Sequence, residues 1–159
     1  MTLKYKPRFK MWANSNKTNE VDEKGKWARS YGWWYYFVEV EGYGILNMSR
    51  YSATTSRHQH DGKLELFSIN PCIVDVVLRH TTANLTMPVH ALDDEIINVR
   101  REIRDLEELI AKPRTRKTAN QKRQYRIEEL KLHIINVERV RLGITERMGY
   151  ESTSVSTNG

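Results

Sequence analysis

The stretch that decides the fold runs from Pro88 to Leu142 and reads PVHALDDEIINVRREIRDLEELIAKPRTRKTANQKRQYRIEELKLHIINVERVRL. Apolar residues recur in it at spacings of three and four, which places them along one side of a helix. The residues of this apolar seam are Leu92, Ile96, Val99, Ile103, Leu106 and Ile110, followed by Ile127, Leu130, Ile134 and Val137. Pro113 interrupts the seam, because a proline lacks the N–H that a helix interior needs. The pattern predicts an antiparallel, coiled-coil-like helical hairpin.

The ends of the two predicted helices carry local signals. Pro88 suits a helix start, where its missing N–H is not needed. The acidic residues at positions 93–95 favour the positive end of the helix dipole. Gly143 or Gly149 is expected to end the second helix. We therefore place the hairpin at residues 88–149 and expect the Ser/Thr-rich residues 150–159 to form a flexible tail.

The part of the chain before the hairpin is expected to be a small antiparallel sheet of about four strands, which gives an α+β fold. Residues 1–30 are polar and basic and are expected to form an N-terminal arm, with the sheet at residues 31–87. The strands are predicted at 33–40, 45–51, 64–69 and 72–78, where β-branched and aromatic residues gather. Residues 52–62 are expected to be a polar connection that ends in an Asp61-Gly62 turn.

The turn between the two predicted helices is strongly basic. It contains seven Lys or Arg residues and no acidic residue, namely Lys112, Arg114, Arg116, Lys117, Lys122, Arg123 and Arg126. A compact cluster of this kind binds phosphates through counterion release, and arginine adds bidentate hydrogen bonds. The alternatives are a solvated charged face and a surface that binds an acidic protein. The cluster nevertheless predicts the polyanion-binding residues of the protein.

An aromatic run at the start of the predicted sheet offers a second candidate surface. Trp33, Trp34, Tyr35 and Tyr36 follow one another, so alternation along a strand places aromatic rings on both faces. A sheet of this kind is not half-solvated. We expect one face to pack on the hairpin or the arm. The other face is either core or exposed for base stacking, a protein partner or self-association.

The segment His58-Gln59-His60-Asp61 resembles a metal-binding sequence, because residues two apart on a strand share a face. A third ligand would have to come from elsewhere, such as His80 or His90, so we expect a polar loop and no metal site. No nucleophile elbow, phosphate loop or dinucleotide fingerprint is present. We therefore predict no catalytic residues, no cofactor and no enzymatic activity.

Net charge, the length of apolar runs and the cysteine content limit the classes of partner and the compartment that we expect. The net charge of +6 and the isoelectric point of about 9.5 favour an acidic partner. No apolar run approaches the roughly 20 residues that span a bilayer, so we expect no membrane partner. Cys72 is the only cysteine, which fits a reducing cytoplasm, or the host cytoplasm if a phage encodes the chain.

The leading interpretation is a non-enzymatic binding protein that contacts nucleic acid or another polyanion through the basic turn. The alternative is a protein–protein adaptor or inhibitor, of the type found among small phage accessory proteins. In that case the aromatic sheet and the hairpin bind an acidic protein partner or form a homo-oligomer.

Overall fold

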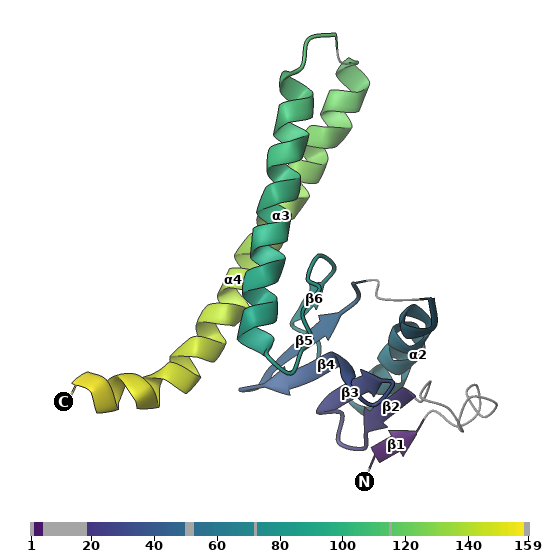
Figure 1. Cartoon of the computed structure of the whole chain (residues 1–159), viewed down its shortest axis with the longest axis vertical. Coiled ribbons are helices and arrows are strands. Elements are labelled where there is room, and N and C mark those ends of the chain that lie inside the picture. Colours follow the sequence, from purple (N-terminus) through teal and green to yellow (C-terminus); the bar gives the residue numbers. More distant parts are fainter. Residues whose placement is uncertain (1, 5–18, 50–52, 72, 115, 158–159) are drawn as a thin grey trace.

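The computed structural model describes residues 2–4, 19–49, 53–71, 73–114 and 116–157 of the 159-residue chain. Cys72 and half of the predicted N-terminal arm, residues 1 and 5–18, lie outside the described residues. The elements in chain order are β1 (Thr2–Lys4), β2 (Asn19–Asp22), β3 (Trp27–Ser30), β4 (Trp34–Val40), β5 (Tyr43–Asn47), α2 (Ala53–Ile69), β6 (Val76–Leu78), α3 (Pro88–Ala111) and α4 (Lys117–Thr157). The fold is α+β, as the sequence predicts (Figure 1).

The sheet is mixed rather than antiparallel. Within the described residues it has six strands in the order β1-β2-β3-β4-β5-β6, and β6 runs parallel to β5. The prediction of about four antiparallel strands is therefore wrong. The three strands that were not predicted, β1, β2 and β3, all lie in the polar stretch 1–30. Parallel neighbours need a crossover connection, usually a helix, and α2 supplies it between β5 and β6.

Helix α2 occupies residues for which the sequence predicted a polar connection and a strand at 64–69. Its buried positions recur at helical spacings of three and four and are Thr55, His58, Gln59, Asp61, Gly62 and Leu66. Most of these residues are polar or lack a side chain, so the helix has no apolar stripe that periodicity would detect. That is why the strand prediction for 64–69 is wrong.

Gly62 is a packing residue and does not form the predicted turn. A Cβ atom at this position would lie 1.8 Å from the hydroxyl oxygen of Tyr36. The missing side chain therefore lets Tyr36 of β4 pass directly against the middle of α2. The Tyr36 hydroxyl donates a hydrogen bond to Asn19 Oδ1 at 2.5 Å, so the contact joins α2, β4 and β2.

The sheet is covered on both faces. On one face Trp34, Tyr36 and Phe37 of β4 pack with Leu66 of α2. On the other face Tyr35 and other strand residues pack against the seam of α3 and α4. Tyr36 and Phe37 share a face because the β3–β4 pairing shifts register by one residue there, which is a β-bulge. The aromatic run is thus divided between two cores.

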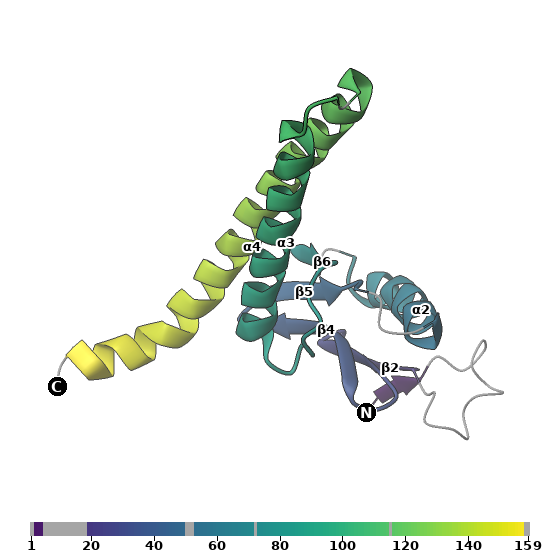
Figure 2. The ribbon, with the colours of Figure 1, turned by 45° about the horizontal axis from the view of Figure 1, so that its top comes forward.

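Helices α3 and α4 are long and pack together; the lower half of α3 and the middle of α4 lie on the sheet, and the C-terminal end of α4 extends away from it (Figures 1 and 2). The seam residues from Leu92 to Ile103 and from Ile127 to Val137 are buried, while Leu106 and Ile110 are half-buried. Helix α3 starts at Pro88 and ends just before Pro113, as predicted. The predicted end of the second helix is wrong, because α4 continues to Thr157.

Gly143 explains why a glycine signal misleads at this position. A Cβ atom on Gly143 would lie 2.1 Å from the hydroxyl oxygen of Tyr43 in β5. The glycine therefore allows close packing of α4 on the sheet and does not terminate the helix. Ile144, the next residue, is fully buried in the same core.

Candidate functional site

The basic turn lies at the end of the α3/α4 pair that points away from the sheet (Figure 1). Lys112 leaves the helix with extended backbone angles, φ −69° and ψ 135°, as expected for a residue before proline. Arg114 has a φ of 69°, which turns the chain sharply toward α4. The turn therefore projects from the end of the two helices, away from the sheet.

Six of the seven predicted polyanion-binding residues lie in or next to this turn, and we call this set the basic tip. Its members are Lys112, Arg114, Arg116, Lys117, Lys122 and Arg123. All are exposed except Arg123, which is half-buried and donates a hydrogen bond to Asn120 Oδ1 at 2.9 Å. Tyr125 is 70% exposed beside them.

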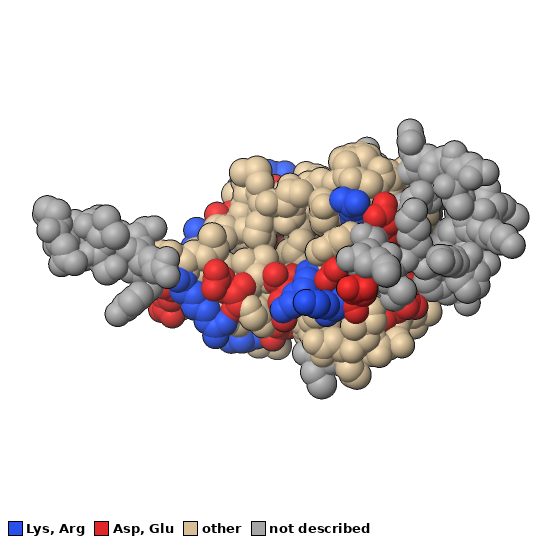
Figure 3. Space-filling model, turned by 90° about the horizontal axis from the view of Figure 1, so that it is seen from below, with Lys and Arg blue, Asp and Glu red and all other residues tan. Residues whose placement is uncertain are grey.

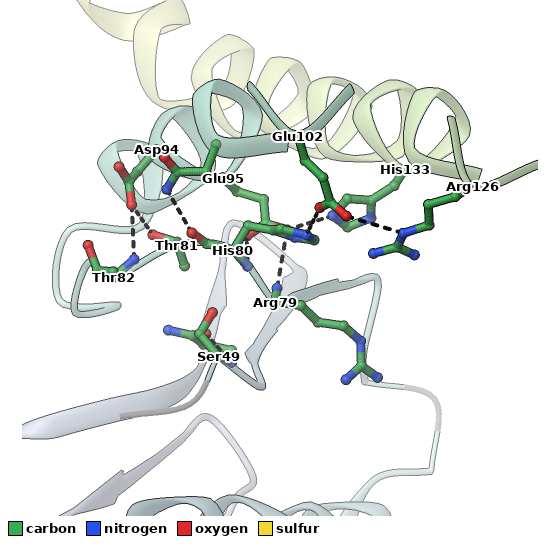
Figure 4. Close-up of polar contacts among 12 residues, drawn as sticks. Ser49, Arg79, His80, Thr81, Thr82, Asp94, Glu95, Glu102, Arg126 and His133 are labelled. Carbon is green, nitrogen blue, oxygen red and sulfur yellow. Dashed lines mark hydrogen bonds and ion pairs between the residues drawn. The ribbon is translucent and has the colours of Figure 1, made fainter. Parts of the chain in front are cut away.

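Arg126, the seventh predicted residue, points elsewhere. Its guanidinium forms ion pairs with Glu102 and Glu129, each at 3.4 Å. These contacts direct Arg126 toward the body of the molecule (Figure 4). We therefore separate it from the basic tip.

The opposite end of the molecule has a different charge distribution. Figure 3 views the protein from that end, where acidic and basic side chains are interspersed among uncharged ones. Several of the charges in this half of the protein are paired, such as Lys26 with Glu39 and Arg29 with Glu20. The run from Lys112 to Arg126 contains no acidic residue at all.

The predicted stacking residues do not form one surface. Trp34 and Tyr36 are buried in the core beneath α2, so neither ring presents a face to a base. Burial also raises the pKa of the Tyr36 hydroxyl. Tyr35 is half-buried and packs edge-on against Trp27. Only Trp33 among the four is exposed, at 48%. The stacking prediction is therefore wrong for Trp34 and Tyr36.

His58 and His60 lie on α2, not on a strand or loop. His58 is buried and its Nδ1 lies 2.6 Å from the Ser30 hydroxyl oxygen, whereas His60 is exposed. Burial, with a smaller contribution from the charge of Arg57, lowers the pKa of His58 to about 4. The two imidazoles therefore have different environments.

A different group of titratable side chains converges between β6, α3 and α4, and we call it the His–Glu cluster: His80, Glu95, Glu102 and His133 (Figure 4). Glu95 is fully buried at its centre. Its Oε1 accepts the His80 backbone N–H at 2.6 Å, and its Oε2 accepts the Arg79 N–H at 3.1 Å. Oε2 also lies 2.7 Å from His133 Nε2 and 3.2 Å from His80 Nδ1.

Glu102 holds the other side of the His80 ring. Its Oε2 lies 2.7 Å from His80 Nε2, and its Oε1 faces Arg126. Both nitrogens of His80 therefore face carboxylates, one from each of two residues that lie seven apart on α3.

The loop after β6 is fastened to α3 by further polar contacts. Asp94 Oδ2 accepts the Thr81 hydroxyl at 2.8 Å and the Thr82 N–H at 3.0 Å. Asn98 donates to the His80 carbonyl at 2.7 Å. Asp93 forms an ion pair with Arg141 of α4. The acidic residues at positions 93–95, predicted to act on the helix dipole, thus hold the loop and α4 in place.

Electrostatics keep Glu95 ionised despite its burial. Burial alone raises the pKa of this carboxyl group, since the charged form loses its solvent. The hydrogen bonds from His133, the two backbone amides and His80 together outweigh burial and lower the Glu95 pKa below its ordinary value. The cluster therefore centres on a buried carboxylate.

A cleft of about 390 Å³ adjoins the cluster. Its lining includes His80, His133, Arg126, Asp75, Leu130 and Asn136. The two imidazoles are 19% and 23% exposed, so they form the contact between the buried Glu95 and this cleft. Small polar ligands and ions have access to the cluster from this side.

Sequence reasoning missed the His–Glu cluster, although a signal was present. Glu95 follows Leu92 by three residues and precedes Val99 by four, so it lies on the buried side of α3. His133 has the same relation to Leu130 and Val137 on α4. Charged or titratable residues on the buried side of a helix need partners, which marks both positions as special.

Within the described residues, no helix is long and apolar enough to cross a membrane. Comparisons with protein-family models, curated proteins and solved structures gave no match to this chain.

Proposed function

We propose that this is a non-enzymatic binding protein that contacts nucleic acid, or a polyanion of similar charge density, through the basic tip. The observation that carries the proposal is the placement of six basic residues at the projecting end of two packed helices. A run of 15 residues without an acidic side chain contains all of them. Such an arrangement gains free energy from released counterions when it meets phosphates.

The dimensions of the tip favour contact with the phosphate backbone over base reading. The major groove of B-DNA is about 12 Å wide and admits a single helix. Two packed helices, each about 10 Å across, are too wide to enter it side by side. The tip therefore meets phosphates at the groove edge. Contacts of this kind fix position without reading sequence.

We further infer that α3 and α4 form a rigid, coiled-coil-like antiparallel hairpin that presents the tip. Support comes from the buried seam, in which Ile103 and Ile127 pack in the same core. A rigid support lowers the entropy cost of holding several cations in one arrangement.

The first prediction concerns the salt dependence of binding. The full-length protein should bind a short fluorescent duplex, and the logarithm of its affinity should fall linearly with the logarithm of salt concentration. The expected slope is about −0.9 for each tip cation that contacts a phosphate of B-DNA. Fluorescence anisotropy at several salt concentrations measures it. An affinity that does not change with salt would contradict phosphate contact.

A second candidate function is self-association through α4, which a set of exposed apolar residues favours. Tyr125, Leu132, Ile135 and Leu142 are 70%, 67%, 63% and 57% exposed. Tyr125 and Leu132 are seven residues apart, as are Ile135 and Leu142, which is the spacing of a coiled-coil contact. A second copy of the same helix offers a matching surface. We propose a homodimer in which these stripes meet.

The second prediction tests this dimer. Changing both Leu132 and Ile135 to lysine should shift the protein to the monomer and leave helicity unchanged, because both side chains are exposed in the single chain. Sedimentation velocity and circular dichroism measure the two properties. Glu107→Lys, exposed on α3, adds the same charge outside the stripe and is the control, which should remain dimeric. A monomeric wild-type protein would contradict self-association while leaving the basic tip unaffected.

A further inference from the structure

We propose that His80, Glu95 and His133 bind one divalent transition-metal ion of the zinc type. Within the described residues, one ligand atom from each of the three side chains lies within 4.8 Å of the other two. The three come from the loop after β6, from α3 and from α4, so an ion would join all three segments. This site is separate from the basic tip and does not depend on the function proposed for it.

The distances between ligand atoms suit a small ion. Zinc lies about 2.0–2.2 Å from nitrogen and carboxylate ligands, so tetrahedral ligand atoms are about 3.4 Å apart. Glu95 Oε2 lies 3.2 Å from His80 Nδ1 and 2.7 Å from His133 Nε2. Adjustments of less than about 1 Å bring these pairs to coordination distances.

The hydrogen bonds around Glu95 leave a position that an ion would satisfy. Its Oε2 lies within 3.2 Å of three nitrogen atoms at once, the Arg79 backbone nitrogen, His80 Nδ1 and His133 Nε2. A carboxylate oxygen has two in-plane lone pairs, so three neighbouring nitrogens crowd it. One metal ion would take the place of the two imidazole protons. Glu95 Oε1 would keep its bond to the His80 backbone.

Glu102 gives His80 the tautomer that a metal ligand needs. Glu102 Oε2 lies 2.7 Å from His80 Nε2; with the proton on Nε2, His80 donates a hydrogen bond to Glu102 and the lone pair of Nδ1 faces Glu95. Metal-binding histidines almost always donate their second N–H to such an acceptor. A lone pair that faces a carboxylate oxygen is repelled by it, so either a second proton or a cation must lie between them.

The set of ligands and the cleft define the class of ion. Two imidazoles and one carboxylate match zinc and its neighbours better than calcium or magnesium, which prefer oxygen ligands alone. The adjoining cleft of about 390 Å³ gives an entry path and room for a water molecule as the fourth ligand. The proposal is therefore a three-residue site with one open coordination position.

The third prediction tests the site by metal titration. Full-length protein, stripped with a chelator and dialysed, should bind one Zn²⁺ per chain by isothermal titration calorimetry and show a raised Tm. Co²⁺ should give visible d–d bands of the intensity typical of four or five ligands. His80→Ala and His133→Ala should each weaken Zn²⁺ binding at least about 100-fold. Glu102→Gln should weaken it about 10- to 100-fold, as is usual for residues that orient a ligand.

Two controls keep the test independent of folding. Glu102 is 34% exposed, so Glu102→Gln should retain the circular dichroism spectrum of the wild type and still show the weaker binding. His90 is exposed on α3, and His90→Ala should bind Zn²⁺ as the wild type does. Equal Zn²⁺ affinity in the wild type and in a folded His80→Ala/His133→Ala double variant would overturn the proposal. So would a wild-type protein that binds no Zn²⁺.

Discussion

Replacing Glu95 with alanine is expected to lower the free energy of unfolding of the metal-free protein by about 3–5 kcal/mol. Glu95 is fully buried and accepts contacts from the backbone N–H groups of Arg79 and His80 and from the rings of His80 and His133. Its removal leaves these donors without an acceptor, and an orphaned buried donor costs more than its hydrogen bond contributes. The loop after β6 would also lose its attachment to α3.

Denaturation with urea in the presence of a chelator measures this loss. Glu107→Ala, at an exposed position of the same helix, is the matched control and should stay within about 0.5 kcal/mol of the wild type. The m-values of the three proteins should agree, so that the midpoints report stability. A loss below about 1 kcal/mol for Glu95→Ala would mean that the cluster contributes little to the fold.

Acidification from pH 6.5 to pH 4 is expected to destabilise the protein by about 3 kcal/mol through His58 alone. Burial and the nearby charge of Arg57 lower the pKa of this imidazole from 6.5 to about 4 in the folded chain. Between these values the unfolded chain binds a proton that the folded chain does not. The stability contribution of neutral His58 is therefore complete above pH 6.5 and is lost as the pH falls toward 4.

Comparing the pH dependence of unfolding in two variants isolates this effect. His58→Gln removes the titrating group, so its stability should depend less on pH between 6.5 and 4 than that of the wild type. Carboxylates that titrate in the same range contribute equally to both proteins and cancel in the comparison. His60→Gln, exposed on the same helix, should behave as the wild type. Identical pH profiles for the wild type and His58→Gln would exclude a buried neutral His58.

The parts of the fold that were predicted from sequence are those whose signal is local and apolar. The seam residues are buried where periodicity placed them, except for the half-buried Leu106 and Ile110, and Pro113 marks the break between the two helices. The strands β4 and β5 follow from their aromatic and β-branched residues. In each of these helices and strands, the spacing or type of the apolar residues along the sequence agrees with the element that forms.

The parts that were missed depend on contacts between distant segments. Helix α2 buries polar residues such as His58 and Gln59, whose partners Ser30 and Asn47 come from strands earlier in the chain. Gly62 and Gly143 suggest turns in the sequence, yet each makes room for a tyrosine from the sheet. No local pattern reveals such a partner.

The same difference between local and long-range contacts explains which candidate site was predicted from the sequence and which was missed. Six residues of the basic tip are adjacent or nearly so in sequence, and their exposure follows from their position at the end of two helices. The His–Glu cluster combines residues up to 53 positions apart, from His80 to His133, and only the tertiary fold brings them together. Its sequence signal is limited to titratable residues on the buried sides of two helices.

The most direct test of binding at the basic tip compares two variants that change the net charge equally. One reverses Arg114, Arg116, Lys117 and Arg123 to glutamate, and the other reverses Arg101, Arg104, Lys131 and Arg139, which lie on the helices outside the tip. Fluorescence anisotropy with a short duplex at several salt concentrations gives the affinity and its salt slope for each. The tip variant should lose at least about 100-fold in affinity, with a slope shallower by roughly three to four, while the other variant keeps most of both. Equal losses in the two variants would show that net charge, and not the tip, determines binding.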